Sequence, residues 1–329
     1  MAAITNTFKT TQAVGNREEL SDVVSRITPE DTPIYTDIRK ESCKSVHPEW
    51  GTDELAAPAE NIHPEGDEYV FDAITPPERM GNYTQIMRKT WILSGTQEVV
   101  DEAGNIQKRN EQKLKRGIEI RKDVELAIVT NNASVGGATR ELGGLPTWIE
   151  TNASRNSGSN GGFNSGTGLT VAETPGTQRA FSKAIVDSVA QQGYSSGANF
   201  RTLYVSPYVK SVFVTFMSDT NVASFRYAAS NGKNNSIVAN ADVYEGPYGK
   251  LMIKPNRVMS TSAAVARRAF FIDTDMVSFK WLRKIQNDKN LAKTGDADKG
   301  VIIGEGTLCV KNEKGIGVAA DLYGLTASS

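Results

Sequence analysis

The sequence of 329 residues predicts an α+β protein that combines extended segments with one unusually long helix. Three observations predict this class. A proline-rich stretch at 44–91 excludes helix over most of its length, because proline lacks an amide donor and constrains its predecessor. A charged stretch with helical periodicity follows at 105–132, and the C-terminal part is rich in strand patterns.

The composition is that of a globular chain with a larger share of polar, loop-forming residues than is typical. Hydrophobic residues make up 39% and the mean hydropathy is -0.38, somewhat below a typical globular chain. Lys and Arg number 37 against 38 Asp and Glu, a net charge of -1. A strong nucleic-acid binder usually carries a basic excess, so any contact with nucleic acid is expected to be weak and non-specific.

Several classes of protein are excluded by simpler features. The two cysteines, Cys43 and Cys309, form no disulfide framework, which predicts synthesis in a reducing compartment, the cytoplasm. No apolar run approaches 18 residues, so no membrane partner is expected. The N-terminus lacks the basic-then-apolar order of a signal peptide.

Residues 1–45 are predicted to form an N-terminal arm. They are polar with scattered apolar anchors, and one short helix is expected at about 17–26. Pro29 and Pro33 follow it closely and prevent its continuation. This pattern favours a segment that lies on another surface rather than a core element.

Residues 46–92 are predicted to form an extended hairpin loop, with strands near 46–55 and 83–92 and an acidic, turn-rich middle. An isolated hairpin is barely stable in water, so we expect it to lie on a neighbouring subunit. The tryptophans at its two ends are either plugs of the core or anchors at an interface. The candidate contact residues between subunits are Glu49, Trp50, Asp53, Leu55 and Trp91.

A short helix is expected after Ser94, because Ser-Gly-Thr-Gln resembles a capping box. The long helix at 105–132 would span roughly 40 Å. Positive charge concentrates on its first half, and either forms a solvated face or meets nucleic acid or a neighbour's acidic arm. The candidate basic patch consists of Lys108, Arg109, Lys113, Lys115 and Arg116.

Residues 135–268 are predicted to form a compact α/β domain. It contains a flexible loop at 152–168, helices at 177–192 and 207–217, a strand at 203–205, and a strand-rich stretch at 243–253.

The strands from residue 269 onward need a cover, and the long helix is the obvious one. We therefore predict a discontinuous peripheral domain, 93–134 with 269–329, into which the axial domain 135–268 is inserted. This leaves four regions: the arm, the loop, the peripheral domain and the axial domain.

Two short motifs resemble catalytic or cofactor-binding sites, but each lacks the other residues that such a site requires. The G-x-S-x-G run at 193–197 would present Ser195 as the nucleophile of an α/β hydrolase, but both histidines, His47 and His63, precede it in the chain. The G-x-G-x-x-A run at 315–320 lacks the acidic residue that a dinucleotide site needs about 20 residues later. The spacings of Cys43, His47, His63 and Cys309 match no common zinc site. We therefore expect no enzyme activity, no metal and no cofactor.

The residues carry a resemblance to a known family. The run Glu49-Trp50-x-x-Asp53-x-Leu55 and the stretch 83–104 leading into the long helix resemble the SU10-type major capsid proteins of tailed phages. The order of arm, loop, spine helix, inserted axial domain and returning strands resembles the HK97-like capsid fold as a whole.

That resemblance implies a virion protein that self-assembles as hexamers and pentamers into an icosahedral shell around double-stranded DNA. It implies an extended loop (E-loop) that overlaps a neighbour. It also implies a portal protein, and scaffolding and decoration proteins, as possible partners. The alternative with the same fold is an encapsulin-like cellular nanocompartment shell that encloses enzyme cargo.

Overall fold

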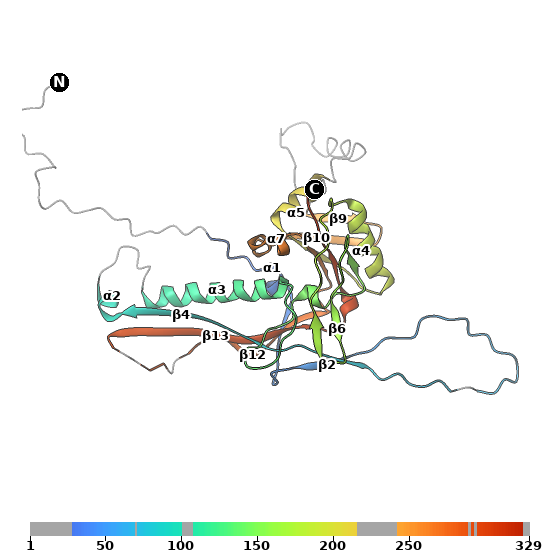
Figure 1. The fold of residues 1–329 in the computed structure, drawn as a ribbon, viewed down its shortest axis with the longest axis horizontal. Coiled ribbons are helices and arrows are strands. Elements are labelled where there is room, and N and C mark those ends of the chain that lie inside the picture. The colour runs from blue at the N-terminus through green and yellow to red at the C-terminus, as the bar shows by residue number, and fades with distance from the viewer. Residues whose placement is uncertain are drawn as a thin grey trace, which may run out of the picture.

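The computed structural model describes residues 28–69, 71–100, 108–215, 242–288, 291–292 and 295–324. The helix predicted at 17–26 lies outside these residues. Figure 1 shows a long flat layer of helix and strands, a second body of sheet and helices at one end of it, and an extended loop that leaves from the same end. None of the helices in the described part has the length and apolar character that crossing a membrane would need.

The flat layer is a four-stranded sheet with the order β1-β12-β13-β4. Strand β12 is antiparallel to β13, β13 is antiparallel to β4, and β1 runs parallel to β12 at the edge. The strands are β1 (Arg39–Ser42), β4 (Gln85–Ser94), β12 (Val277–Asp288) and β13 (Ala297–Val310).

The spine helix α3 (Arg109–Val129) lies along one face of this sheet (Figure 1). Ile120, Val124 and Ile128 recur every four residues and are fully buried, so one stripe of the helix faces the sheet. At about 1.5 Å per residue the helix is roughly 30 Å long. A long helix is thus present where it was predicted, but it is shorter than 105–132 and covers β4, β12 and β13 rather than all the strands from residue 269 onward. Ser94 caps α2 (Gly95–Val99) as predicted, by accepting a hydrogen bond from the Gln97 amide at 3.3 Å.

The second body holds a six-stranded sheet with the order β5-β14-β11-β8-β10-β9. Helices α4 (Lys183–Ser195) and α5 (Pro207–Thr215) pack on it (Figure 1). The remaining short elements lie around these two bodies. The strands are β5 (Ala153–Ser154), β8 (Thr202–Val205), β9 (Val243–Gly246), β10 (Gly249–Pro255), β11 (Ala269–Ile272) and β14 (Ile316–Ala319); the others are α1 (Pro33–Asp37), η3 (Leu145–Thr147), η5 (Val258–Thr261), α7 (Ala263–Ala266) and η6 (Glu313–Gly315).

Two strands pair elsewhere than the sequence suggested. β11 and β14 were expected in the peripheral domain, yet β11 pairs with β8 and with β14 in the six-stranded sheet. All residues of both strands are buried, which suits central strands covered on both faces. The two sheets therefore do not divide at residue 268, where the boundary was predicted.

The extended loop also pairs differently. The stretch 83–92 was expected to be its returning strand, but this stretch belongs to β4, which pairs with β13. The returning strand is β3 (Glu78–Gly81), which pairs with β2 (Glu49–Thr52). Met87, Trp91 and Leu93 alternate with exposed residues and bury one face of β4, which explains why β4 joins the sheet.

Two further predictions need correction. The stretch 152–168 contains β5 and the first strand of a small hairpin, β6 (Gly162–Asn164) with β7 (Leu169–Val171). Phe163 on β6 stacks on the buried Trp148, which a flexible loop would not do. Helix α4 starts at Lys183 rather than 177, because Arg179 and Phe181 donate their amides to carbonyls of Asp321 and Gly324.

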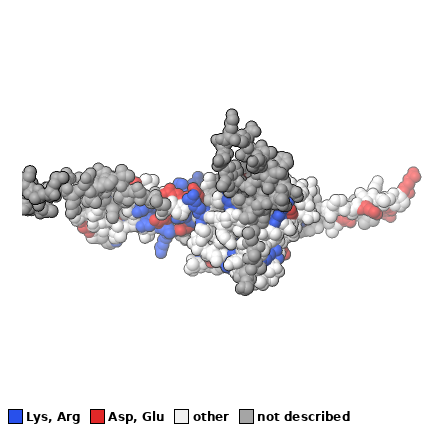
Figure 2. Space-filling view, turned by 90° about the horizontal axis from the view of Figure 1, so that it is seen from above, with Lys and Arg blue, Asp and Glu red and all other residues white. Residues whose placement is uncertain are grey.

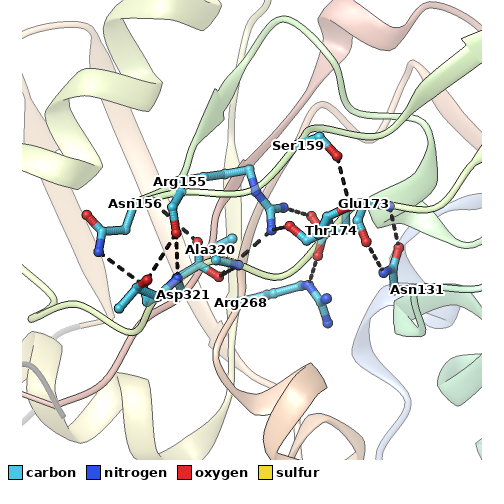
Figure 3. A network of polar contacts seen from close by, with 12 residues as sticks. Asn131, Arg155, Asn156, Ser159, Glu173, Thr174, Arg268, Ala320 and Asp321 are labelled. Carbon is cyan, nitrogen blue, oxygen red and sulfur yellow. Dashed lines mark hydrogen bonds and ion pairs between the residues drawn. The ribbon is translucent and has the colours of Figure 1, made fainter. Parts of the chain in front are cut away.

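Buried charges join the middle of the chain to its C-terminal part (Figure 3). The carboxylate of Glu173 accepts hydrogen bonds from the guanidinium groups of Arg155 and Arg268. The side chain of Asn131, just beyond the end of α3, bonds both the amide and the carbonyl of Glu173 at 3.0 and 2.8 Å. Asp321, at a positive φ of 60°, accepts the amide of Gly176 at 2.8 Å.

We expect Glu173→Gln to lower the free energy of unfolding by about 3–5 kcal/mol, because it removes the counter-charge of the buried Arg268 and leaves the buried Arg155 with Asp321 alone, at 3.8 Å. Chemical denaturation of the subunit checks this. The control Glu245→Gln removes an exposed carboxylate that pairs with Lys250, and should change stability by less than about 0.5 kcal/mol. Similar effects of the two substitutions would contradict a stabilising role for this network.

A second buried carboxylate, Glu125, holds the start of the described chain against the spine helix. It accepts the amides of Ile34 and Tyr35, at 3.0 and 2.7 Å, and the side-chain amide of Asn256 at 2.6 Å. Burial raises the pKa of Glu125 from 4.5 to about 7, although these three hydrogen bonds favour the ionised form. The spine helix, α1 and the end of β10 thus meet at one titratable group.

This shift predicts a pH dependence of stability. Between pH 4.5 and about 7 folded Glu125 holds a proton that the unfolded chain has released. The free energy of unfolding should therefore fall as pH rises through this window, by at most about 3 kcal/mol, and be level above it. Denaturation at several pH values, with Glu125→Gln as reference, isolates the contribution. A difference between the two proteins that does not change with pH would contradict the assignment.

Candidate contact surface between subunits

The root of the extended loop is attached firmly to the subunit. The indole nitrogen of Trp50 on β2 donates to the carbonyl of Val310 at 2.8 Å, and the hydroxyl of Thr52 donates to the carbonyl of Lys311 at 2.8 Å. The Trp50 ring lies 5.6 Å from that of Trp148. Because side-chain bonds and ring packing act together, the hairpin β2–β3 leaves the body in a defined direction.

Beyond Thr52 the loop extends away from the rest of the subunit (Figure 1). Residues 53–77 include seven Asp and Glu but no Lys or Arg. Figure 2 shows acidic side chains along this projection and basic ones only on the body. The loop also carries large apolar side chains, which its own subunit leaves 83–98% exposed: Leu55, Ile62, Tyr69, Phe71 and Ile74.

A groove of 660 Å³ opens where the loop leaves the body. Asp53, Glu54 and Glu78 line it from the loop, and Glu150 and Glu313 line it from the body. Lys314 partly neutralises this acidic wall through an ion pair with Glu54 at 2.6 Å. The loop root therefore presents an acidic surface mixed with apolar side chains, which suits contact with a basic or amphipathic segment.

The structure brings four of the five candidate contact residues to this root. Glu49 pairs with Arg79 across the hairpin, Trp50 is half-buried, and Asp53 and Leu55 are exposed. Trp91 lies apart on β4, 7% exposed, with its indole over Gly300. The position of Trp91 favours a role in the hydrophobic core over a role at an interface. Trp50 packs on its own subunit, where the exposed part of the loop begins.

Two of the five residues of the candidate basic patch form ion pairs with acidic neighbours. Arg109 pairs with Asp298, and Arg116 pairs with Glu119 at 2.6 Å. Lys108, Lys113 and Lys115 are half-buried. Figure 2 shows Lys and Arg interspersed with Asp and Glu on this side of the molecule. This arrangement favours the solvated helix face over a strong anion-binding surface.

The sequence analysis missed Ile62, Tyr69, Phe71 and Ile74 as contact candidates. These residues lie in a proline-bounded stretch without the periodicity that marks a helix or a long strand. The signal available in the sequence was four large apolar residues in a stretch that is otherwise acidic and polar, since such residues need a partner when the stretch has no core of its own.

The structure shows that the two motifs resembling catalytic and dinucleotide-binding sites are parts of ordinary secondary structure. Ser195 is the last residue of α4, so its motif is a helix end rather than a turn from strand to helix. Gly315 belongs to the short turn η6, and Gly317 lies within β14. Cys43 is half-buried and Cys309 buried, and burial raises the pKa of both thiols. Among the described residues no three His, Cys, Asp or Glu side chains are grouped as metal ligands.

Comparison with known proteins decides the family. The model of the SU10 major capsid protein family matches residues 3–323. The chain belongs to this family. It is also 25% identical to the major capsid protein of Escherichia phage Phieco32, over 95% of this chain and 96% of that protein.

Two solved capsid structures are similar in fold. One is the capsid asymmetric unit of cyanophage A-1(L), at a TM-score of 0.60 and 11% identity, covering 95% of this chain and 98% of that one. The other is a structure of the phage G major capsid and decoration proteins, at a TM-score of 0.51 and 9% identity, covering 97% of this chain and 99% of the other. These likenesses show a mixed α+β, HK97-like capsid fold.

As a member of the SU10 family, the protein is a tailed-phage major capsid protein, a non-enzymatic component of the icosahedral shell of the virion. The predicted family and function are confirmed. The hydrolase alternative is wrong, and the family match leaves no support for the nanocompartment alternative.

We expect Trp50→Ala to impair assembly more than folding of the subunit. The substitution removes the bond to Val310 and the packing on Trp148, which orient the loop, while most of the core is untouched. Circular dichroism should change little, whereas the yield of particles should fall about tenfold or more, as for loss of a contact that orients an interface residue.

The control Trp50→Phe keeps a ring but loses the hydrogen bond, and should give an intermediate yield of particles. Equal losses of helical signal and of particles in Trp50→Ala would contradict an orienting role.

Proposed function

We propose that this capsid subunit assembles as hexamers and pentamers around double-stranded DNA, with the extended loop of each subunit lying on a neighbour. The observation that carries the proposal is the loop itself. Its large apolar side chains are 83–98% exposed in the isolated subunit, although its root is rigidly held. A rigid attachment combined with unburied apolar surface is expected of a segment that completes its burial on another copy.

The four-part organisation supports this arrangement. In our proposal an arm (1–45) and the extended loop make contacts, the layer of spine helix and four-stranded sheet forms the peripheral domain, and the body around the six-stranded sheet forms the axial domain. Because β11 pairs with β8 on one side and with β14 on the other, residues 269–272 and 316–319 belong to the axial domain in this proposal.

Contact with DNA is proposed to be weak and non-specific. The net charge is -1, and two of the five candidate basic residues form ion pairs within the subunit. Electrostatic contacts of this kind weaken with salt. A portal protein and scaffolding proteins remain predicted partners. Decoration proteins are a further candidate, since the phage G structure contains them beside the major capsid protein.

Electron microscopy of the purified protein tests the proposal. We expect negatively stained particles of uniform diameter that show both five-fold and six-fold clusters of subunits. A variant in which a short Gly-Ser linker replaces residues 56–74 should fold, because the described residues of this stretch lie outside helices and strands, yet should not form particles. A uniform monomer at high concentration, or normal particles from the loop-shortened variant, would contradict the proposal.

A further inference from the structure

A small pocket lies between helix α4 and the hairpin of β9 and β10, on the body around the six-stranded sheet (Figure 1). Four aromatic side chains line it: Tyr194, Phe200, Tyr244 and Tyr248. The first belongs to the last turn of α4, the second follows that helix, and the other two belong to β9 and to the turn after it. The rest of the lining is small or apolar except for one charged residue, Asp187 on α4.

Contacts within the wall of the pocket hold it in shape. The hydroxyl of Tyr244 donates a hydrogen bond to Oδ1 of Asp187, which joins β9 to α4. The rings of Tyr194 and Tyr248 lie 5.7 Å apart and are 66% and 38% exposed. A carboxylate can accept several hydrogen bonds, so Asp187 can bind a further donor without losing Tyr244. The pocket therefore offers aromatic rings and a carboxylate to a ligand without first having to rearrange.

Size and charge select the chemical class of the ligand. The cavity volume is about 20 Å³, whereas a single water needs roughly 10–15 Å³ on the same measure. The pocket thus admits a group of one or two heavy atoms and excludes a nucleobase, a sugar or an aromatic side chain. Its one charged residue is acidic, and the faces of aromatic rings attract cations. A primary ammonium at the end of an alkyl chain meets all of these conditions.

We propose that this pocket binds the terminal ammonium group of an alkylamine, with Asp187 as its counter-charge. The site goes beyond self-assembly, because one subunit supplies all of its lining residues. Two sources can supply the ammonium group. One is a free polyamine, since the phosphates of enclosed DNA concentrate cations around them, and the other is a lysine side chain of a neighbouring copy. Both present the same methylene and ammonium end to the pocket.

Titration of the purified, unassembled subunit with butylamine tests the site. Its tyrosines are replaced by 3-fluorotyrosine, and their fluorine NMR signals are assigned by single substitutions. The signals of Tyr194 and Tyr248 should shift and reach saturation, because the cation lies against these rings. Butan-1-ol has the same alkyl chain without the charge and should shift them little.

Two substitutions separate the charge from the ring contact. Asp187→Asn keeps the size of the side chain and an acceptor for Tyr244, and should weaken butylamine binding about fivefold or more, because the opposite charge is lost. Tyr248→Leu keeps an apolar side chain without the aromatic face and should weaken binding about threefold. Tyr248 lies in an exposed turn, so its substitution should leave folding unchanged.

The matched controls lie outside the pocket. Glu245→Gln removes an exposed carboxylate of β9 that pairs with Lys250, and Tyr208→Leu removes an exposed ring of α5. Each should change the affinity by less than about twofold. The absence of a saturating shift, equal shifts with butylamine and butan-1-ol, or equal losses in Asp187→Asn and Glu245→Gln would overturn the inference. The proposed shell would still stand, because this titration uses unassembled protein.

Assembled particles distinguish the two sources of the ammonium group. Lysines of wild-type and Asp187→Asn particles are acetylated and mapped by mass spectrometry, and uptake of labelled spermidine is measured by dialysis. A lysine that is protected from acetylation in wild-type particles alone identifies a neighbouring copy as the source. Higher uptake of spermidine by wild-type particles than by the variant identifies the free amine. Equal acetylation together with equal uptake would overturn the inference for the assembled shell.

Discussion

The direction of the extended loop depends on the attachment of Trp50. Beyond the four residue pairs of β2 and β3, the described residues of the loop form no strand or helix that could fix its direction. Its orientation is therefore determined where the Trp50 indole bonds the carbonyl at the end of β13 and packs on Trp148. Trp148 in turn stacks on Phe163 of the hairpin β6–β7. One aromatic cluster thus relates the loop to the four-stranded sheet and to the hairpin β6–β7.

The distribution of charge gives the loop a second property. The chain carries a net charge of -1 and residues 53–77 carry -7, which leaves +6 on the rest. Copies of the chain therefore attract one another through loop and body, although the whole chain is almost neutral. Such attraction speeds association and weakens with salt, whereas burial of apolar surface contributes to affinity independently of charge. Because the loop is acidic, it is also expected to have little affinity for nucleic acid.

Local patterns in the sequence predicted local structure well. The stripe of Ile120, Val124 and Ile128, the cap at Ser94 and the prolines of the loop all act over a few residues, and the structure has the helix, the cap and the extended segment there. Strand pairing joins residues far apart in the chain, so the sequence did not reveal that β4 pairs with β13 or that β14 lies beside β11. The network around Glu173 had no sequence signal for the same reason, since its partners are as distant as Arg268 and Asp321.

Rigidity and exposure are divided between body and loop, and the division has a physical basis. Buried charges at Glu173 and Glu125 join the spine helix, the N-terminal segment and the six-stranded sheet, and any relative movement would leave charged or polar groups unpaired. The loop has no such groups to lose, since its residues contact water. The bonds within the loop are few and exposed, such as those of His63 with Asn61 and Asp67. The loop can therefore change conformation on a partner at little loss of bonding, and conformational entropy is its main cost. A rigid body with a rigidly rooted but unpaired loop is thus suited to making the same contact with each neighbour in a closed shell.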